Sequence, residues 1–213
     1  DLRQTKGLPL GVSQKLARKY GIEISQDSLE VYQHIIEEHK KLSQKASKSV
    51  FKGGLAEDTP KIRALHTVTH LMLAGLRKYL GTEVQQKGSN ITEERTRFDV
   101  SYPQKIEREV LDKVESYVNE AIASGASVGV QMMDKQEAQD SGDVIGSFWE
   151  RYPDMVKVYQ ISNSKGDIYS RELCGGPHVN TMQEIAKFGV FRITKEESCS
   201  AGVRRIKAVL EGK

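Results

Sequence analysis

Two short motifs, far apart in the chain, carry side chains that bind metal ions. The first contains His66 and His70 in a strongly helical segment. Residues four apart lie one turn apart on a helix, so both imidazoles leave the same face. The second contains Cys174 and His178, again four apart, on a tight turn with two glycines and a proline. Three imidazoles and one thiolate are a sufficient ligand set for one zinc ion.

Each motif alone has an ordinary structural explanation. A histidine pair on a helix is more often packed or solvated than metal-bound, and a cysteine is more often a small buried hydrophobe. The chain has five histidines and two cysteines, however, and three of the former and one of the latter fall in these motifs. This concentration favours a metal site. Because catalytic zinc usually keeps a position for water, four protein ligands by themselves favour a structural site.

Length and composition limit the number of domains and the classes of function. A chain of 213 residues, 38% apolar and 29% charged, can form one domain or one domain with an appendage. The net charge of +3 permits a nucleic-acid partner without arguing for one. Two cysteines give no disulfide framework, and a reduced Cys174 fits the cytoplasm. There is no membrane-length apolar run and no signal peptide. Because the sequence starts at Asp1, we expect a fragment of a longer protein.

The first fifty residues form a helical segment of their own. Glycines and a proline predict a turn or loop over residues 1–12, after which Ser13 begins a short helix that ends at Gly21. A second helix begins at Ser25 or Asp27 and runs out through basic residues to position 48. Its basic end is interpreted as solvated rather than as an RNA surface. The break at residues 51–54 predicts a boundary between domains 1–50 and 51–213.

The helix with the histidine pair has clear ends. Asp58 or Thr59 caps it, Pro60 occupies its first turn and Gly81 ends it. A broad apolar stripe indicates that the helix packs inward and presents the two histidines at one edge. Either histidine alone could still be a core residue.

Helices and hairpins alternate in the remaining sequence. Residues 84–91 and 95–100 predict an antiparallel hairpin, Pro103 begins a long helix that Gly125 closes, and Asp134 caps a short one. Further strands are predicted at residues 128–132, 156–160, 168–170, 188–193 and 203–209. The fold class is therefore α+β, an antiparallel sheet packed with helices and preceded by the small helical segment.

Polar residues near the metal motifs suggest a small polar ligand. Gln86, Ser89 and Asn90 follow the histidine helix, and Thr67 and Thr69 flank the histidines. Amide and hydroxyl groups that line a cleft can hydrogen-bond a small substrate. Without further information, ordinary strand and turn residues are the simpler explanation.

Five motifs occur in a fixed order along the chain. They are His66-Thr67-Val68-Thr69-His70-Leu71, Gln86-Lys87-Gly88-Ser89, Arg97-Phe98-Asp99, Glu172-Leu173-Cys174-Gly175-Gly176-Pro177-His178-Val179 and Gly202-Val203-Arg204-Arg205-Ile206. This series is similar to the editing domain of alanyl-tRNA synthetase, over roughly residues 60 to 210, and implies the editing-domain fold of alanyl- and threonyl-tRNA synthetases. The family usually has Thr where Pro177 stands.

The N-terminal part carries a second resemblance. The run from Thr5 to Leu10, followed by helices, is similar to the end of that synthetase's tRNA-recognition region, which favours a piece of a full synthetase over a free-standing factor. Only residues 51–59 separate the two regions. The Gly-rich β-barrel found there in many members is therefore expected to be absent, as in a shortened bacterial form.

The resemblance implies an activity and a site. The family hydrolyses the ester that joins serine or glycine to the alanine tRNA, because a pocket shaped for alanine excludes neither strongly. It implies tRNA(Ala) and an ATP-binding aminoacylation domain as partners, and Zn²⁺ as cofactor. It assigns the zinc ligands and places Gln86 in the substrate pocket, with Thr67 as a second candidate catalytic residue and Arg204 and Arg205 as phosphate contacts. The ligands implied are His66, His70, Cys174 and His178.

Two other functions remain open at this point. The chain could be a tRNA-binding module in which zinc only holds the fold, and would then bind RNA in a salt-dependent way without turnover. It could also be a plain interaction domain that binds no tRNA. Exposed strand charges are as good an explanation of Arg204 and Arg205 as phosphate contacts.

Overall fold

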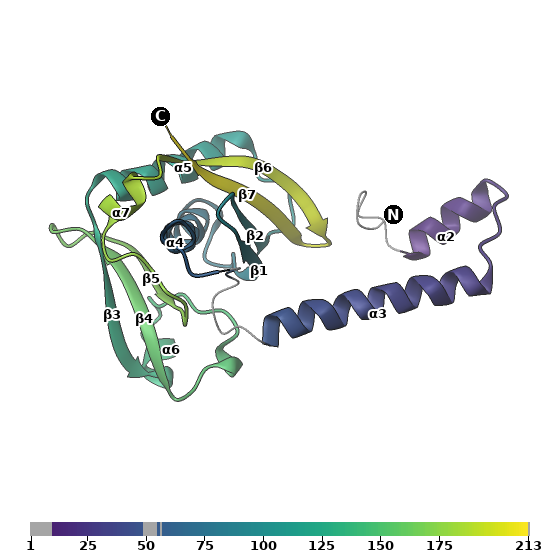
Figure 1. The fold of residues 1–213 in the computed structure, drawn as a ribbon, viewed down its shortest axis with the longest axis horizontal. Coiled ribbons are helices and arrows are strands. Elements are labelled where there is room, and N and C mark those ends of the chain that lie inside the picture. The colour runs from purple at the N-terminus through teal and green to yellow at the C-terminus, as the bar shows by residue number, and fades with distance from the viewer. Residues whose placement is uncertain (1–9, 49–54, 56, 213) are drawn as a thin grey trace. The chain divides into compact units, whose positions relative to one another are not determined.

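Figure 1 shows the computed structural model, which describes residues 10–48, 55 and 57–212. The chain divides into two units, residues 1–50 and 51–213. The described part of the first unit holds two helices, α2 (Leu10–Lys19) and α3 (Gln26–Lys48). The loop expected over residues 1–12 is wrong for residues 10–12, because Gly11 is accommodated in the first turn of α2. Residues 1–9, and the break expected at residues 51–54, lie outside the described residues.

The central helix of the second unit is α4 (Pro60–Leu80). Its ends are as predicted: the Thr59 hydroxyl accepts from the Ile62 N–H at 3.3 Å, Pro60 is in the first turn, and Gly81 follows the last residue. Helix α4 contacts strands of both sheets and helix α5, and Figure 1 shows it enclosed by them. This position explains why most of its residues are buried, the two histidines included.

The strands form two antiparallel sheets, whereas the sequence predicted one. The four-stranded sheet has the order β1-β2-β7-β6, and the three-stranded sheet has the order β3-β4-β5. The α+β class with antiparallel strands packed against helices is confirmed. The strand bounds are β1 (Gln86–Ile91), β2 (Thr96–Ser101), β3 (Ser127–Asp134), β4 (Met155–Ser162), β5 (Ile168–Leu173), β6 (Val190–Ser200) and β7 (Val203–Glu211).

Helices cover these sheets. Helix α5 (Arg108–Ala123) begins five residues later than predicted, after Glu107, and packs along α4. Asp134 caps α6 (Lys135–Asp140) as predicted, accepting from two N–H groups. Helix α7 (Met182–Ala186) and the 3-10 turn η1 (Trp149–Arg151) were not predicted. No helix in the described part of the chain is long and apolar enough to cross a membrane.

The turn before β6 predicts a strongly destabilising substitution. Gly189 has φ +105°, and a Cβ there would lie 1.8 Å from the Glu211 carbonyl oxygen. We expect Gly189→Ala to lower the free energy of unfolding by at least about 3 kcal/mol, measured by urea titration. Gly202→Ala is the matched control, since φ is +70° but nothing lies within 4 Å; it should lose only about 1 kcal/mol. Equal losses in the two variants would show that the contact with the Glu211 carbonyl is relieved without a cost in free energy.

Candidate metal centre

Two distant segments bring four ligand atoms into one buried cluster. Helix α4 supplies His66 and His70, and the loop after β5 supplies Cys174 and His178. The Nε2 atoms of His66 and His70 are 3.3 Å apart, and the Cys174 sulfur is 3.5 Å from His66 Nε2. All four ligand atoms lie within 4.8 Å of one another. A zinc tetrahedron with Zn–N of about 2.05 Å and Zn–S of about 2.3 Å has edges of about 3.4 and 3.5 Å.

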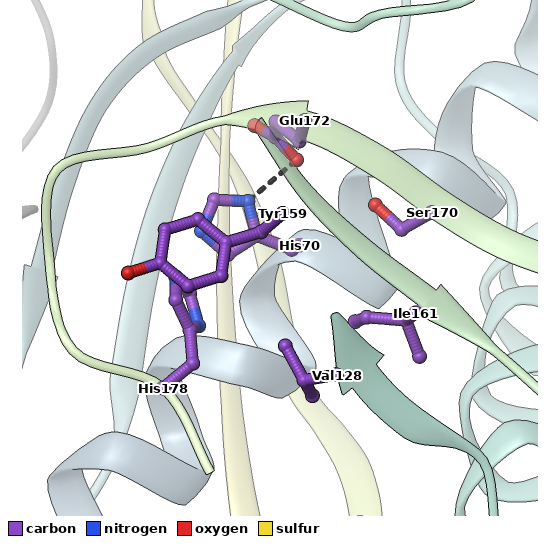
Figure 2. Close-up of a pocket in the computed structure, with 7 residues that line it drawn as sticks. All are labelled: His70, Val128, Tyr159, Ile161, Ser170, Glu172 and His178. Carbon is purple, nitrogen blue, oxygen red and sulfur yellow. Dashed lines mark ion pairs between the residues drawn. The ribbon is translucent and has the colours of Figure 1, made fainter. Parts of the chain in front are cut away.

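The outer nitrogens of two histidines are held by acceptors. His66 Nδ1 lies 2.9 Å from the Pro177 carbonyl oxygen, and His70 Nδ1 lies 2.5 Å from Glu172 Oε2. Figure 2 shows the second contact, with Glu172 above the His70 ring. Because a carbonyl and a carboxylate can only accept, both Nδ1 atoms carry the proton. Both Nε2 lone pairs therefore face the cluster, as metal ligation requires.

Thr67 holds the third histidine in the same way. Its hydroxyl donates to the Arg63 carbonyl oxygen at 2.9 Å, so its oxygen can only accept from other groups. It accepts from His178 Nδ1 at 3.1 Å and from the Val179 N–H at 3.3 Å. His178 Nε2 is buried and has no hydrogen-bond partner among the described residues. The structure thus places Thr67, predicted as catalytic, behind a ligand; a direct role in the reaction stays a prediction.

The arrangement can hold a metal cation. Two neutral imidazoles whose protons are on Nδ1 cannot hydrogen-bond to each other through Nε2, although His66 and His70 meet there at 3.3 Å. Buried polar atoms without partners are rare and call for an explanation such as a bound ion. Three inward lone pairs and one sulfur are the donor set that zinc prefers. The residues present therefore fit a zinc ion.

The pKa values of the cluster point the same way. Burial raises the pKa of Cys174, but His66 and His70 outweigh burial and place it well below its usual range, which favours the thiolate. Burial lowers the pKa of His178 to about 3, which keeps this imidazole neutral. Burial also lowers the pKa of His70, but Glu172 and Cys174 outweigh it and raise that pKa. The surroundings thus favour a thiolate next to a positive charge, which a bound metal ion would supply in place of the second proton of His70.

The cluster borders a small pocket. His70 and His178 form one side, together with the aromatic ring of Tyr159, whose centroid is 4.3 Å from that of His178 (Figure 2). The cavity volume is about 10 Å³, which is close to the space that one water molecule needs. The pocket therefore suits a water-sized group placed beside the candidate metal ligands. The other lining residues are Val128, Ile161, Ser170 and Glu172.

The remaining predicted site residues lie on the other sheet. Gln86 is on β1, where its amide donates to the Ser89 hydroxyl at 3.2 Å. Arg205, on β7, makes a two-pronged contact with Asp99, at 2.7 and 2.8 Å. Arg204 pairs with Glu196. The structure does not bring these three residues into the pocket lining, and their proposed roles stay predictions.

The Arg204 ion pair predicts an effect on stability. The side chains of Arg204 and Glu196 are only 14% and 6% exposed, so Arg204→Ala leaves a buried carboxylate without its cation. We expect a loss of about 3–5 kcal/mol in the free energy of unfolding, measured by urea titration. Arg192→Ala, which breaks an exposed pair with Glu211, should change it by less than about 1 kcal/mol. If Arg204→Ala and Arg192→Ala lower the free energy of unfolding equally, the Arg204–Glu196 pair contributes no more than an exposed pair. Arg204 would then be available for another partner.

Comparisons with known proteins place the chain. The family model described as "Threonyl and Alanyl tRNA synthetase second additional domain" matches residues 156–207. An alanine–tRNA ligase of Treponema denticola is 44% identical over 210 residues, 99% of this chain and 33% of that protein. That of Borreliella burgdorferi is 44% identical over 209 residues, 98% of this chain and 33% of that protein. The chain belongs to the alanyl-tRNA synthetase family.

This member of the alanyl-tRNA synthetase family spans about a third of the length of those curated relatives. An alanine–tRNA ligase of Neisseria meningitidis is 43% identical over 144 residues, 68% of this chain and 15% of that protein. The part matched by the family model includes Cys174 and His178 but not the two histidines of α4. The resemblance drawn from the motifs is thus confirmed at the level of the family.

Sequence reasoning missed three groups around the candidate metal ligands of this synthetase-family chain. Glu172 and the Pro177 carbonyl hold histidine protons, and Ser170 lines the pocket. Glu172 and Pro177 lie in the same motif as Cys174 and His178, so their position in the sequence could have indicated a role beside the ligands. Ser170 carries no such signal, because only the register of β5 places it on the pocket side.

Proposed function

We propose that this chain is an editing unit that hydrolyses the ester of seryl- or glycyl-tRNA(Ala) at a zinc ion. The observation that carries the proposal is the cluster of His66, His70, Cys174 and His178 beside a small pocket. Such a site complements an aminoacylation pocket shaped for alanine, which cannot strongly exclude glycine or serine. We further propose that residues 1–50 are the end of a tRNA-recognition region and that the whole protein is a cytoplasmic alanine–tRNA ligase.

The reaction adds water to the carbonyl carbon of the ester. The bond between that carbon and the ribose oxygen breaks, and the ribose oxygen takes up a proton. When bound, zinc would supply a Lewis acid that holds or polarises the carbonyl or the water. The chain's own residues orient the site: Thr67, Glu172 and the Pro177 carbonyl fix the three imidazoles. The Gly176 N–H donates to the Cys174 sulfur at 3.4 Å, which stabilises the thiolate.

The substrate contacts belong to the same proposal. Gln86 is proposed to reach the aminoacyl end from β1, and Arg204 and Arg205 to meet phosphates of the acceptor arm. Arg205 is the better candidate of the two, since its side chain is 27% exposed and that of Arg204 is 14% exposed. Phosphate contacts of this kind would make tRNA binding weaken with salt.

One observation favours a second function. Four protein ligands are typical of a closed, structural zinc site. In that case the chain would be a non-catalytic module that binds tRNA, with zinc holding α4 to the loop after β5. The two functions make opposite predictions about turnover.

The experiment is deacylation of serine-charged tRNA(Ala) by this chain, with and without a zinc chelator. Under the proposal the ester is released much faster than in buffer, and the chelator abolishes the release. Unchanged release under chelation, with zinc shown to be removed, would refute a zinc-dependent reaction. Salt-dependent tRNA binding without release, with zinc bound, would support the structural alternative. Alanyl-tRNA(Ala) serves as the control substrate that should survive.

A further inference from the structure

One buried hydroxyl faces the pocket without a partner. Ser170 is 4% exposed, and its Oγ makes no hydrogen bond among the described residues. Figure 2 shows this hydroxyl turned toward the side of the pocket where Glu172 and His70 lie. A buried hydroxyl without a partner is costly and usually marks a bound water, an ion or a ligand.

The strand register explains why Ser170 faces the metal ligands. Ser170 is directly opposite Ile161 on β4, which in turn is opposite Val128 on β3. These three residues form one row across the three-stranded sheet. Glu172, two residues further along β5, lies on the same face and contacts His70. Ser170 is therefore the polar member of an otherwise apolar row that borders the metal centre.

We propose that Ser170 recognises the side-chain hydroxyl of a seryl ester bound in this pocket. The inference rests on the proposed function and specifies how the site selects its substrate. The pocket has room for a group the size of a water molecule, such as a hydroxyl, and the walls formed by Val128 and Ile161 offer no hydrogen bond to it. A seryl hydroxyl can both donate and accept, so it completes the partnerships of Ser170 Oγ.

The same contact separates serine from alanine and glycine. An alanyl methyl group in this position would leave the Ser170 hydroxyl buried and unpaired, which disfavours correctly charged tRNA. Glycine has no side chain to place there, so its hydrolysis should not depend on Ser170. The predicted signature is therefore a change in the ratio of seryl to glycyl hydrolysis, which general damage to the fold would not produce.

The test compares Ser170→Ala with the parent chain on both substrates. We expect kcat/KM for seryl-tRNA(Ala) to fall about 10- to 100-fold and that for glycyl-tRNA(Ala) to stay unchanged. The melting temperature should not fall, because the variant removes a buried hydroxyl that has no partner. Ser116→Ala is the control: this exposed hydroxyl donates to the Asp112 carbonyl on α5, and its loss should alter neither substrate.

A binding measurement keeps the inference testable apart from turnover. Seryl and glycyl groups joined by an amide to 3′-amino-3′-deoxyadenosine are not hydrolysed as esters, and calorimetry measures their affinities. We expect the parent to prefer the seryl compound and Ser170→Ala to lose about 10-fold or more for that compound alone.

The outcomes separate the inference from the proposed function. If the parent hydrolyses neither ester, the proposed function fails, and the binding preference decides the role of Ser170. If the parent is active but Ser170→Ala leaves both the seryl-to-glycyl ratio and the seryl affinity unchanged, Ser170 holds only a buried water. An equal loss for both substrates assigns it a structural role. Either of these two results overturns the inference.

Discussion

Replacing Cys174 by alanine is expected to leave the chain without bound zinc and without deacylation of seryl-tRNA(Ala). The substitution removes the only sulfur of the cluster and leaves the Gly176 N–H without its acceptor. Loss of an outer partner of a ligand lowers metal affinity about 10- to 100-fold, and loss of a ligand itself should exceed that. The measurements are the zinc content after dialysis and the rate of ester release.

The second cysteine provides the control. Cys199 lies on β6 and is half-buried, outside the ligand cluster. Cys199→Ala should bind zinc and release the ester as the parent does. If Cys174→Ala binds no zinc yet deacylates at the parent rate, the metal has no part in the reaction and the proposed mechanism is wrong. If it still binds one zinc per chain, the three histidines are sufficient.

Thr67→Val is expected to weaken zinc binding about 10- to 100-fold although Thr67 touches no metal. The valine keeps the shape of the side chain but cannot accept from His178 Nδ1 or the Val179 N–H. His178 then loses the contact that keeps its proton on the outer nitrogen. The unpaired groups should also lower the free energy of unfolding by about 1–3 kcal/mol. Zinc affinity is measured by competition with a chelating dye.

Thr69→Val separates these two effects. Thr69 is also buried on α4, donates to the Leu65 carbonyl at 2.7 Å and pairs with the Thr96 hydroxyl at 2.9 Å. Its hydroxyl does not hold a metal ligand. We therefore expect a comparable loss of stability with zinc affinity like that of the parent. Similar losses of zinc affinity in both variants would show that loosening α4, rather than the orientation of His178, weakens the site.

The helix that carries His66 and His70 could be predicted because its signals are local. Thr59, Pro60 and Gly81 act on the backbone next to them, and they set the ends of α4. The spacing of His66 and His70 fixes their common face in the same local way. Joining this pair to the motif of Cys174 and His178 rested on ligand chemistry and on the resemblance, because nothing local relates segments 108 residues apart.

The predicted hairpin of β1 and β2 is present, but the pairing of distant strands could not be predicted from the sequence. Strand β2 pairs with its neighbour β1 on one side but with the distant β7 on the other, and β3, β4 and β5, which lie between β2 and β7 in sequence, form a separate sheet. Alternation shows which face of a strand is apolar but not which strand lies beside it. The late start of α5 has a related cause: Ile106 is buried in the core before the helix begins at Arg108. Helix α7 had a local signal, the capping box of Thr181 and Glu184, and was overlooked.

The wide separation of partners also sets an order of assembly during synthesis. Helix α4 and the β1–β2 hairpin leave the ribosome long before their partners, so the nascent chain presents a histidine pair without Cys174 and an unpaired edge on β2. Neither can be completed locally. The four-residue cluster is complete only once His178 has been made, and the four-stranded sheet is complete only with β7, which ends at Glu211. Until then the unpaired edge of β2 is exposed to aggregation, which is the hazard that chaperones counter.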